Sequence, residues 1–420
     1  MKKIKKLFQH ELFKSSAWIM SGSIVNKGAL LIYGIFLARK FGDEFFGTYG
    51  LIKNAILTTI IFSSIGLNIA INKIIAKLNF NIDNEKISRQ ISQAFLLVIG
   101  INVLVALLIY FNSEIVSKLI FTSEGLSSLL KISTIVILTN SISNFQEGVL
   151  YGLKEFKYIS IANIVTGILT LTLSIAVTFY AGMVGAILSL GLIQMIKICI
   201  YLKRTSSFVK IKHLSKVHLM KTTELLNISI PISLQEIVFA ASYFLINILI
   251  VQKFSVGDLA YYTAALHWNS IILFVPVMLK NVFLSHLSSK SKDNFNREIY
   301  QMLIITFITS IIPALFFYIL TDVIEDTYGD SFNGLSEILR ISIFLTIFTS
   351  ISNILSQALI SLSLNWTLFI LKFARELLII SLFYWLSQNG KGYEYIFYVS
   401  MLAYFLFILF NAYYIKKSMS

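Results

Sequence analysis

The sequence is poor in charged residues. Asp, Glu, Lys and Arg together make up 13% of its 420 residues, whereas hydrophobic residues make up 56%. Soluble domains carry about 25% charged residues. The shortage excludes an ordinary soluble domain and indicates a protein that is embedded in lipid.

Cysteine and proline are also scarce, and the common motifs of catalysis are missing. The single cysteine, Cys199, excludes an internal disulfide and a metal site built from cysteines. Three prolines and 20 glycines leave little material for long loops. The sequence has no phosphate-binding glycine loop, no metal-ligand cluster and no nucleophile triad. We therefore predict that the protein is not an enzyme and needs neither a cofactor nor a metal.

Basic residues outnumber acidic ones, 35 to 21, which gives a formal net charge of +14 at pH 7. Such an excess can indicate nucleic-acid binding. Most of these residues, however, lie in short connections between apolar runs, as the positive-inside rule predicts for cytoplasmic loops. We therefore expect membrane lipids rather than nucleic acid as the partner of this charge.

Long apolar runs make up most of the chain and predict an all-α membrane protein. The runs are continuous rather than alternating, which excludes the strands of a membrane barrel. About twelve spans of about 20 residues can be placed. They cover residues 15–38, 47–72, 91–111, 129–151, 159–181, 183–202, 225–252, 259–285, 299–321, 338–360, 366–388 and 393–415.

Lysines and arginines are distributed unevenly between the two sets of connections. One set, with the two termini, carries 22 of them and the opposite set carries 5. This asymmetry predicts a multi-pass protein with both termini in the cytoplasm. The predicted parts are a basic amphipathic tail (1–14), an N-terminal lobe of six spans (15–203), a basic cytoplasmic linker (204–224), a C-terminal lobe of six spans (225–415) and a cytoplasmic tail (416–420).

The two halves resemble each other in sequence. Leu-Lys-Ile-Ser at Leu130 matches Leu-Arg-Ile-Ser at Leu339, and Ser-Ile-Ser-Asn occurs at both Ser141 and Ser350, with a constant offset of 209 residues. Because each half has an even number of spans, this internal repeat is parallel, and a substrate site near the midplane with alternating access is expected. The alternative is a duplicated scaffold that does not move.

Lys27 lies twelve residues from the start and eleven from the end of the first predicted span, 15–38. At about 1.5 Å per residue this places it about 18 Å deep in the membrane, too deep for its side chain to reach the headgroups. A charge near the bilayer centre costs at least about 2.5 kcal/mol unless it faces a cavity or an ion-pair partner. We interpret Lys27 as part of a polar cavity for an anion, with a structural ion pair as the alternative.

The other basic residues inside spans extend this interpretation. Candidate substrate-binding residues are Lys27, Lys53, His267, Lys280, Lys372 and Arg375. This surplus of basic groups favours an anion, since a cavity for a cationic drug is expected to contain unpaired carboxylates. Lys53 is near the start of its span, so the alternative interpretation is that its side chain reaches the lipid headgroups. Lys372, Arg375 and Glu376 share one helical face. A structural role for this cluster is the alternative to substrate binding.

Acidic residues inside spans are fewer. Glu236 lies eleven residues into the seventh predicted span. A carboxylate among bases can exchange a proton, because burial raises its pKa and a neighbouring cation lowers it. We assign Glu236 and Glu376 to coupling or charge balance.

Several short segments have the look of a known family's motifs. They are Asn26-Lys27, Phe46-Gly47-Thr48-Tyr49-Gly50, Ser64-Ile65-Gly66-Leu67-Asn68 and Tyr328-Gly329-Asp330-Ser331-Phe332. Together they resemble the O-antigen and polysaccharide flippase family (Wzx type) of the multidrug/oligosaccharidyl-lipid/polysaccharide (MOP) superfamily.

The resemblance implies a MOP/MATE-like fold in the inner membrane. It implies a flippase that moves an undecaprenyl-pyrophosphate-linked oligosaccharide from the cytoplasmic to the periplasmic leaflet. Basic residues in the first, second and eighth spans line the cavity in similar flippases, and Lys27, Lys53 and Lys280 or His267 occupy comparable places. Further partners implied are a polysaccharide polymerase and a chain-length regulator.

Other functions stay open on the sequence alone. A multidrug exporter of the same superfamily is the nearest, although the basic interior argues against it. A membrane polymerase or glycosyltransferase would need an outer catalytic loop. The acidic connection from Asp322 to Asp330 is the one candidate for this, and we expect it to be a solvated connection.

Overall fold

The computed structural model describes residues 2–64, 66–77, 80–120, 127–206, 219–279 and 292–419, and every regular element in these ranges is a helix. Within these ranges, eight stretches are long and apolar enough to cross a membrane, and one of them, Phe156–Thr205, has 50 residues. The prediction of an all-α integral membrane protein is therefore confirmed.

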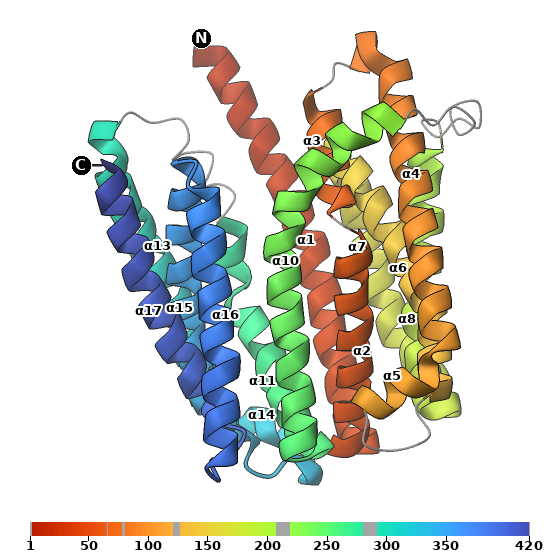
Figure 1. Ribbon diagram of the computed structural model, residues 1–420, viewed down its shortest axis with the longest axis vertical. Helices are drawn as coiled ribbons and strands as arrows, with labels where there is room; N and C mark the ends of the chain where they lie inside the picture. The colour runs from red at the N-terminus through yellow and green to blue at the C-terminus, as the bar shows by residue number, and fades with distance from the viewer. Residues whose placement is uncertain are drawn as a thin grey trace. The chain divides into compact units, whose positions relative to one another are not determined.

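The helices follow one another along the chain with few long breaks (Figure 1). In order they are α1 (Lys2–Phe41), α2 (Asp43–Ser64), α3 (Leu67–Lys77), α4 (Phe80–Phe111), α5 (Ser113–Ile120), α6 (Ser127–Gly152), α7 (Phe156–Leu169), the π-helix η1 (Thr170–Ser174), α8 (Ile175–Thr205), α10 (Leu219–Lys253), α11 (Val256–Ile272), α13 (Lys292–Ile319), α14 (Thr321–Tyr328), the 3-10 helix η2 (Asp330–Phe332), α15 (Leu335–Ser361), α16 (Asn365–Gln388) and α17 (Tyr395–Met419).

One predicted span is interrupted in the structure, and the predicted boundary between two others is confirmed. The second predicted span, 47–72, is broken, because α2 ends at Ser64 and α3 begins at Leu67 with Gly66 at φ +62°. The fifth and sixth spans are separated within the long Phe156–Thr205 stretch by the non-helical backbone of Gly182 (φ 54°, ψ −134°). Apolar composition locates the spans, whereas backbone conformation decides where a helix is interrupted.

The chain divides into two compact units. The first unit comprises Met1–Tyr33 and Ile52–Ala240. Its core contains buried side chains of α3, α4 and α6 together with Tyr201 of α8. Within it, α6 packs against α3, α4 and α8.

Glycine permits the close approach of α3 and α6 in the first unit. A Cβ atom added at Gly148 would lie 2.4 Å from the backbone oxygen of Asn68. We predict that Gly148→Ala lowers the free energy of unfolding by about 1–3 kcal/mol, as overpacking does. Gly100→Ala on α4 is the matched control, since nothing lies within 4 Å of its added Cβ. Thermal melts of the purified variants test this, and equal melting temperatures would contradict it.

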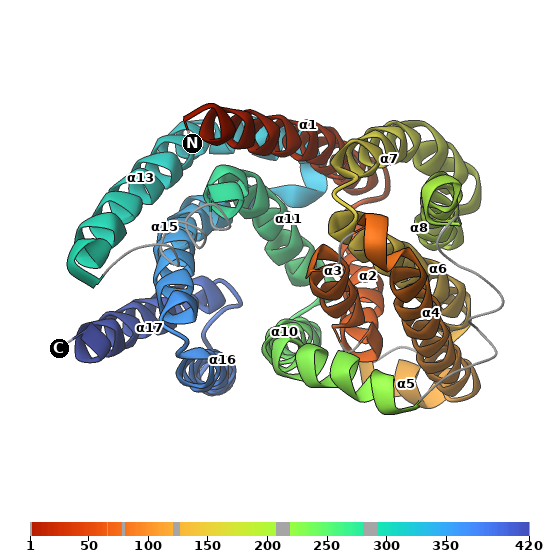
Figure 2. The ribbon, with the colours of Figure 1, turned by 90° about the horizontal axis from the view of Figure 1, so that it is seen from above.

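The second unit comprises Gly34–Leu51 and Ala241–Ser420. Here α15 packs against α11, α13 and α17 (Figure 2). The end of α1 and the start of α2 belong to this unit. Phe46 is fully buried there, with ring centroids 6.4 Å from Tyr328 and 6.0 Å from Phe332.

The internal repeat is confirmed by the order of the helices and by their packing. In the first unit α4 and α8 pack on α6, and in the second α13 and α17 pack on α15 (Figure 2). The repeated serines have corresponding roles. Ser141 donates to Asn102 Oδ1 at 2.6 Å across α6 and α4, and Ser350 lies 2.6 Å from Ser310 across α15 and α13.

Candidate functional site

The structure distributes the sequence-predicted site residues over both units. Lys27 on α1 and Glu236 on α10 have exposed side chains, and Lys53 on α2 is half-buried. These three belong to the first unit. His267 on α11 and Lys372 on α16 are half-buried in the second unit.

Two predicted residues remain to be placed, and a third lies outside the described part of the chain. Arg375 and Glu376 on α16 are buried and form an ion pair with each other. Lys280 falls in the range 280–291, outside the described residues, as do residues 207–218 of the predicted linker. Whether the predicted residues form one substrate site stays a prediction.

The buried Arg375 is held by both charge and stacking. Its Nε donates to Glu376 Oε1 at 3.1 Å. Its guanidinium carbon lies 4.3 Å from the centre of the Tyr404 ring and 4.8 Å from that of Phe407, both on α17. A guanidinium between a carboxylate and two aromatic faces gains both an ion pair and cation–π attraction. This arrangement links α16 to α17.

His267 packs against an aromatic side chain in the second unit. Its ring meets Phe46 edge-on, with centroids 5.9 Å apart. A Cβ added at Gly34 of α1 would lie 3.5 Å from its Nδ1 atom. The imidazole therefore packs against the α1 and α2 segments that belong to the second unit.

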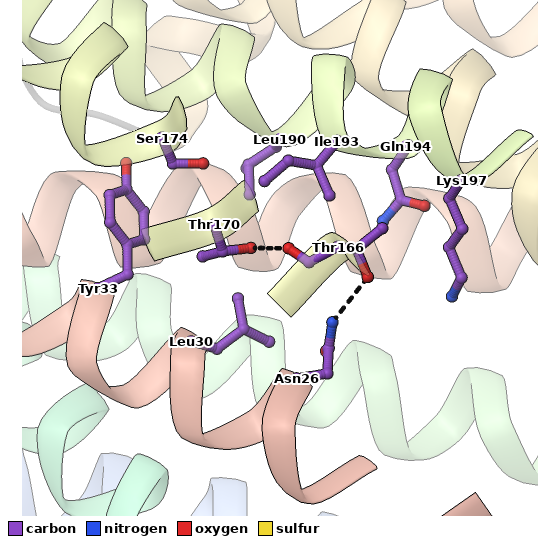
Figure 3. Close-up of a pocket in the computed structure, with 10 residues that line it drawn as sticks. All are labelled: Asn26, Leu30, Tyr33, Thr166, Thr170, Ser174, Leu190, Ile193, Gln194 and Lys197. Atoms are coloured by element: carbon purple, nitrogen blue, oxygen red, sulfur yellow. Dashed lines mark hydrogen bonds between the residues drawn. The ribbon is translucent and has the colours of Figure 1, made fainter. Parts of the chain in front are cut away.

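A polar cavity of about 90 Å³ lies within the first unit, and sequence reasoning did not find it. Figure 3 shows side chains from α1, α7, η1 and α8 directed toward it. We call it the polar cavity. It is lined by Asn26, Leu30, Tyr33, Thr166, Thr170, Ser174, Leu190, Ile193, Gln194 and Lys197.

Hydrogen bonds fix the side chains around the polar cavity. Asn26 Nδ2 donates to Thr166 Oγ1 at 3.1 Å, and Thr170 Oγ1 donates to the carbonyl of Thr166 at 2.8 Å (Figure 3). The hydroxyl of Tyr33 lies 2.7 Å from Thr178 Oγ1. These bonds join α1 to α7 and to α8.

An ion pair lies at one end of the polar cavity. Lys197 Nζ of α8 donates to Glu147 Oε2 of α6 at 2.6 Å, and the Tyr201 hydroxyl donates to the same oxygen at 3.2 Å. The two charged side chains are 13% and 22% exposed. Because each charge has a close partner of opposite sign, the polar cavity has little net charge.

Spacing in the sequence contains a signal for the polar cavity. Thr166, Thr170 and Ser174 recur every four residues in an apolar span, and Gln194 and Lys197 are three apart in the next. These spacings place each set on one helical face. Neutral polar side chains inside an apolar span are a weaker signal than charged ones, so this stripe does not stand out in the sequence.

The acidic connection before α15 has a structural role in the described chain. Glu325 accepts hydrogen bonds from the backbone nitrogens of Gly334 at 2.9 Å and Ser336 at 2.7 Å. Partial burial alone would raise the pKa of Glu325, but these bonds and Arg340 bring it below its ordinary value. Asp322 is paired with Arg340 at 2.7 Å. These carboxylates stabilise the start of α15.

The family is established by comparison with known proteins. A family model described as "Polysaccharide biosynthesis protein" matches residues 12–279. The chain belongs to this polysaccharide biosynthesis family. No sequence among the curated proteins matches it.

Solved structures similar to this polysaccharide biosynthesis protein share its fold. An inward-facing multidrug resistance MATE family transporter of the MOP superfamily is 15% identical with a TM-score of 0.81, over 96% of this chain and 98% of that chain. An outward-facing multidrug resistance MATE family transporter of the MOP superfamily is 13% identical with a TM-score of 0.72, over 97% of this chain and 95% of that chain.

A third similar structure, a MOP superfamily transporter from Pyrococcus furiosus, is 14% identical with a TM-score of 0.65, over 98% of this chain and 96% of that chain. At these identities the likeness shows the fold alone. The predicted MOP/MATE-like fold is confirmed, and the chain is a multi-pass membrane protein of polysaccharide biosynthesis.

Proposed function

We propose that this protein is a flippase that moves an undecaprenyl-pyrophosphate-linked oligosaccharide from the cytoplasmic to the periplasmic leaflet of the inner membrane. Membership of a polysaccharide biosynthesis family together with a transporter fold is the observation that carries the proposal. The resemblance of the sequence to flippases of lipid-linked oligosaccharides supplies the proposed substrate.

The position of Lys27 supports an anionic substrate. Lys27 lies in the middle of a predicted span, and its side chain is exposed on α1 rather than covered by its own unit. Hydrocarbon around this ammonium would cost at least about 2.5 kcal/mol. A water-filled or substrate-filled cavity removes that cost, and a pyrophosphate supplies the opposite charge.

The remaining basic residues fit the same substrate. In the proposal, Lys53, Lys372 and His267 add positive charge for the pyrophosphate or for acidic sugars, and Lys280 does so from the eighth span. The lipid tail stays in the bilayer during alternating access. Glu236 remains the proposed coupling residue, the termini are proposed to be cytoplasmic, and a polymerase and a chain-length regulator are the proposed partners.

A multidrug exporter is the second candidate function, because two of the similar structures are named multidrug resistance transporters. Another is described by the words "reverse polarity of binding pocket suggests different function". One fold thus accommodates binding pockets of opposite polarity, and the basic span residues of this chain favour the anion.

Deleting the gene tests the proposed function. We expect lipid-linked oligosaccharide to accumulate in the cytoplasmic leaflet, measured by radiolabelled sugar in the lipid fraction and by protection from external glycosidase, and the wild-type gene to reverse this. Finished lipid-linked units that reach the outer leaflet but are not polymerised would instead show a polymerase. Unchanged glycan with increased drug sensitivity would show an exporter.

A further inference from the structure

We infer that the polar cavity of the first unit binds the hydroxylated edge of a sugar ring, with Ser174 and Thr170 as the contact residues. This inference rests on the proposed function, because a glycan carrier supplies such a ligand. It assigns a sugar subsite to neutral side chains, apart from the basic residues proposed for the pyrophosphate.

An unsatisfied hydroxyl points to a ligand in the polar cavity. Ser174 is 1% exposed, and its Oγ has no hydrogen-bond partner among the residues that the structure describes. Ser174 lines the polar cavity (Figure 3). A buried hydroxyl without a partner costs free energy, which a ligand hydroxyl in hydrogen-bond reach recovers.

The internal repeat has larger side chains at the corresponding positions of the second unit. The offset of 209 relates the start of α7 at Phe156 to the start of α16 at Asn365. It also relates Thr166 to Arg375 and Thr170 to Ile379, which are 8% and 3% exposed. The second unit therefore fills these positions with large buried side chains, whereas the first unit keeps an open, polar space.

The π-helix is a second difference between the repeats. Residues Thr170–Ser174 form η1 in the first unit, while α16 is a continuous α-helix. Single-turn π-helices carry an energetic cost and are frequent at functional sites. Here the π-helix supplies both contact residues of the proposed subsite.

Charge and hydrogen-bonding capacity select the ligand class. A metal cation is disfavoured because the Lys197 ammonium lines the polar cavity, and a free anion is disfavoured because Glu147 balances that ammonium at 2.6 Å. The amides of Asn26 and Gln194 and the hydroxyl of Ser174 both donate and accept, and the hydroxyl of Thr170, which donates to Thr166, can accept a further hydrogen bond. A neutral group with several hydroxyls matches this mixture.

The size of the polar cavity limits what enters it. Its volume of about 90 Å³ is large enough for several water molecules but far smaller than an oligosaccharide. That space suits a hydroxymethyl group and a neighbouring hydroxyl rather than a whole oligosaccharide. The cavity is also partly open rather than sealed, so that the rest of the ligand can remain outside.

Saturation-transfer NMR on the full chain in nanodiscs tests the inference. Free glucose, galactose, N-acetylglucosamine and rhamnose serve as probes at millimolar concentration. We expect at least one sugar to bind, and the double variant Thr170→Val, Ser174→Ala to weaken its Kd about tenfold, as the loss of two hydrogen bonds predicts. A measured melting temperature close to that of the wild type establishes that the variant is folded.

Thr172→Val is the matched control, because Thr172 lies on the same π-helix and bonds the carbonyl of Ile168 but does not line the polar cavity. It should bind sugar as the wild type does. No sugar signal, or equal Kd values in all variants, would overturn the inference. Glycan accumulation in the deletion strain is measured separately. The absence of sugar binding in the polar cavity can therefore be distinguished from the absence of flippase activity.

Discussion

Replacing Arg375 by alanine is expected to destabilise the protein by about 3–5 kcal/mol, as measured for broken buried ion pairs. The substitution leaves the Glu376 carboxylate, which is 5% exposed, without its ion-pair partner. It also removes the guanidinium that stacks on Tyr404 and Phe407. Thermal and denaturant unfolding of the purified variant measure the loss.

Two further variants separate charge from packing. Arg375→Met with Glu376→Leu replaces the ion pair by apolar groups, and should recover much of the loss. Lys391→Ala removes an exposed lysine that lies over the Tyr395 ring, and should change stability by no more than about 0.5 kcal/mol. If Arg375→Ala were as stable as Lys391→Ala, the Arg375 side chain would have no role in holding α16 on α17.

Lys27→Ala is expected to reduce glycan export by about 10- to 100-fold, which corresponds to the 1.5–3 kcal/mol of a hydrogen bond to a charged group. Lys27→Arg keeps the positive charge at the same depth in α1 and should retain export. Lipid-linked oligosaccharide in the cytoplasmic leaflet is the quantity to measure, after confirming equal amounts of each variant in the membrane.

Lys131→Ala is the control for position. Lys131 lies near the start of α6, 5.8 Å from the centre of the Tyr110 ring, and is not a proposed substrate contact. Its loss should leave export unchanged. If Lys27→Ala kept full export, Lys27 would have no anion-binding role. If Lys27→Arg reduced export as severely as Lys27→Ala, a positive charge at this position would not be sufficient for export.

The helices were predictable from the sequence because apolar runs of about 20 residues indicate transmembrane helices. The short helices α5 and α14 lie in predicted connections, and eight amphipathic residues are too few for a search for spans to find. The break at Gly66 depends on one backbone angle, which hydrophobicity does not encode. The repeated Ser-Ile-Ser-Asn motif is visible in the sequence, but the hydrogen bond from Ser141 to Asn102 depends on how α6 packs against α4.

The candidate site was less predictable than the fold. Charges within spans stand out in a sequence, so Lys27 and Arg375 were noticed, but the partners of a charge depend on how helices pack. Lys197 and Glu147 are 50 residues apart in the chain and form an ion pair only because α8 packs on α6. The polar cavity likewise requires four separate elements to meet.

Translocation by the purified protein tests the central claim most directly. The measurement uses proteoliposomes with undecaprenyl-pyrophosphate-linked oligosaccharide in the inner leaflet and a membrane-impermeant glycosidase outside. We predict that the protein makes the glycan accessible to the enzyme, and that Lys27→Ala slows this relative to Lys27→Arg. Accessibility no greater than in protein-free liposomes would contradict the proposal that this protein is a flippase.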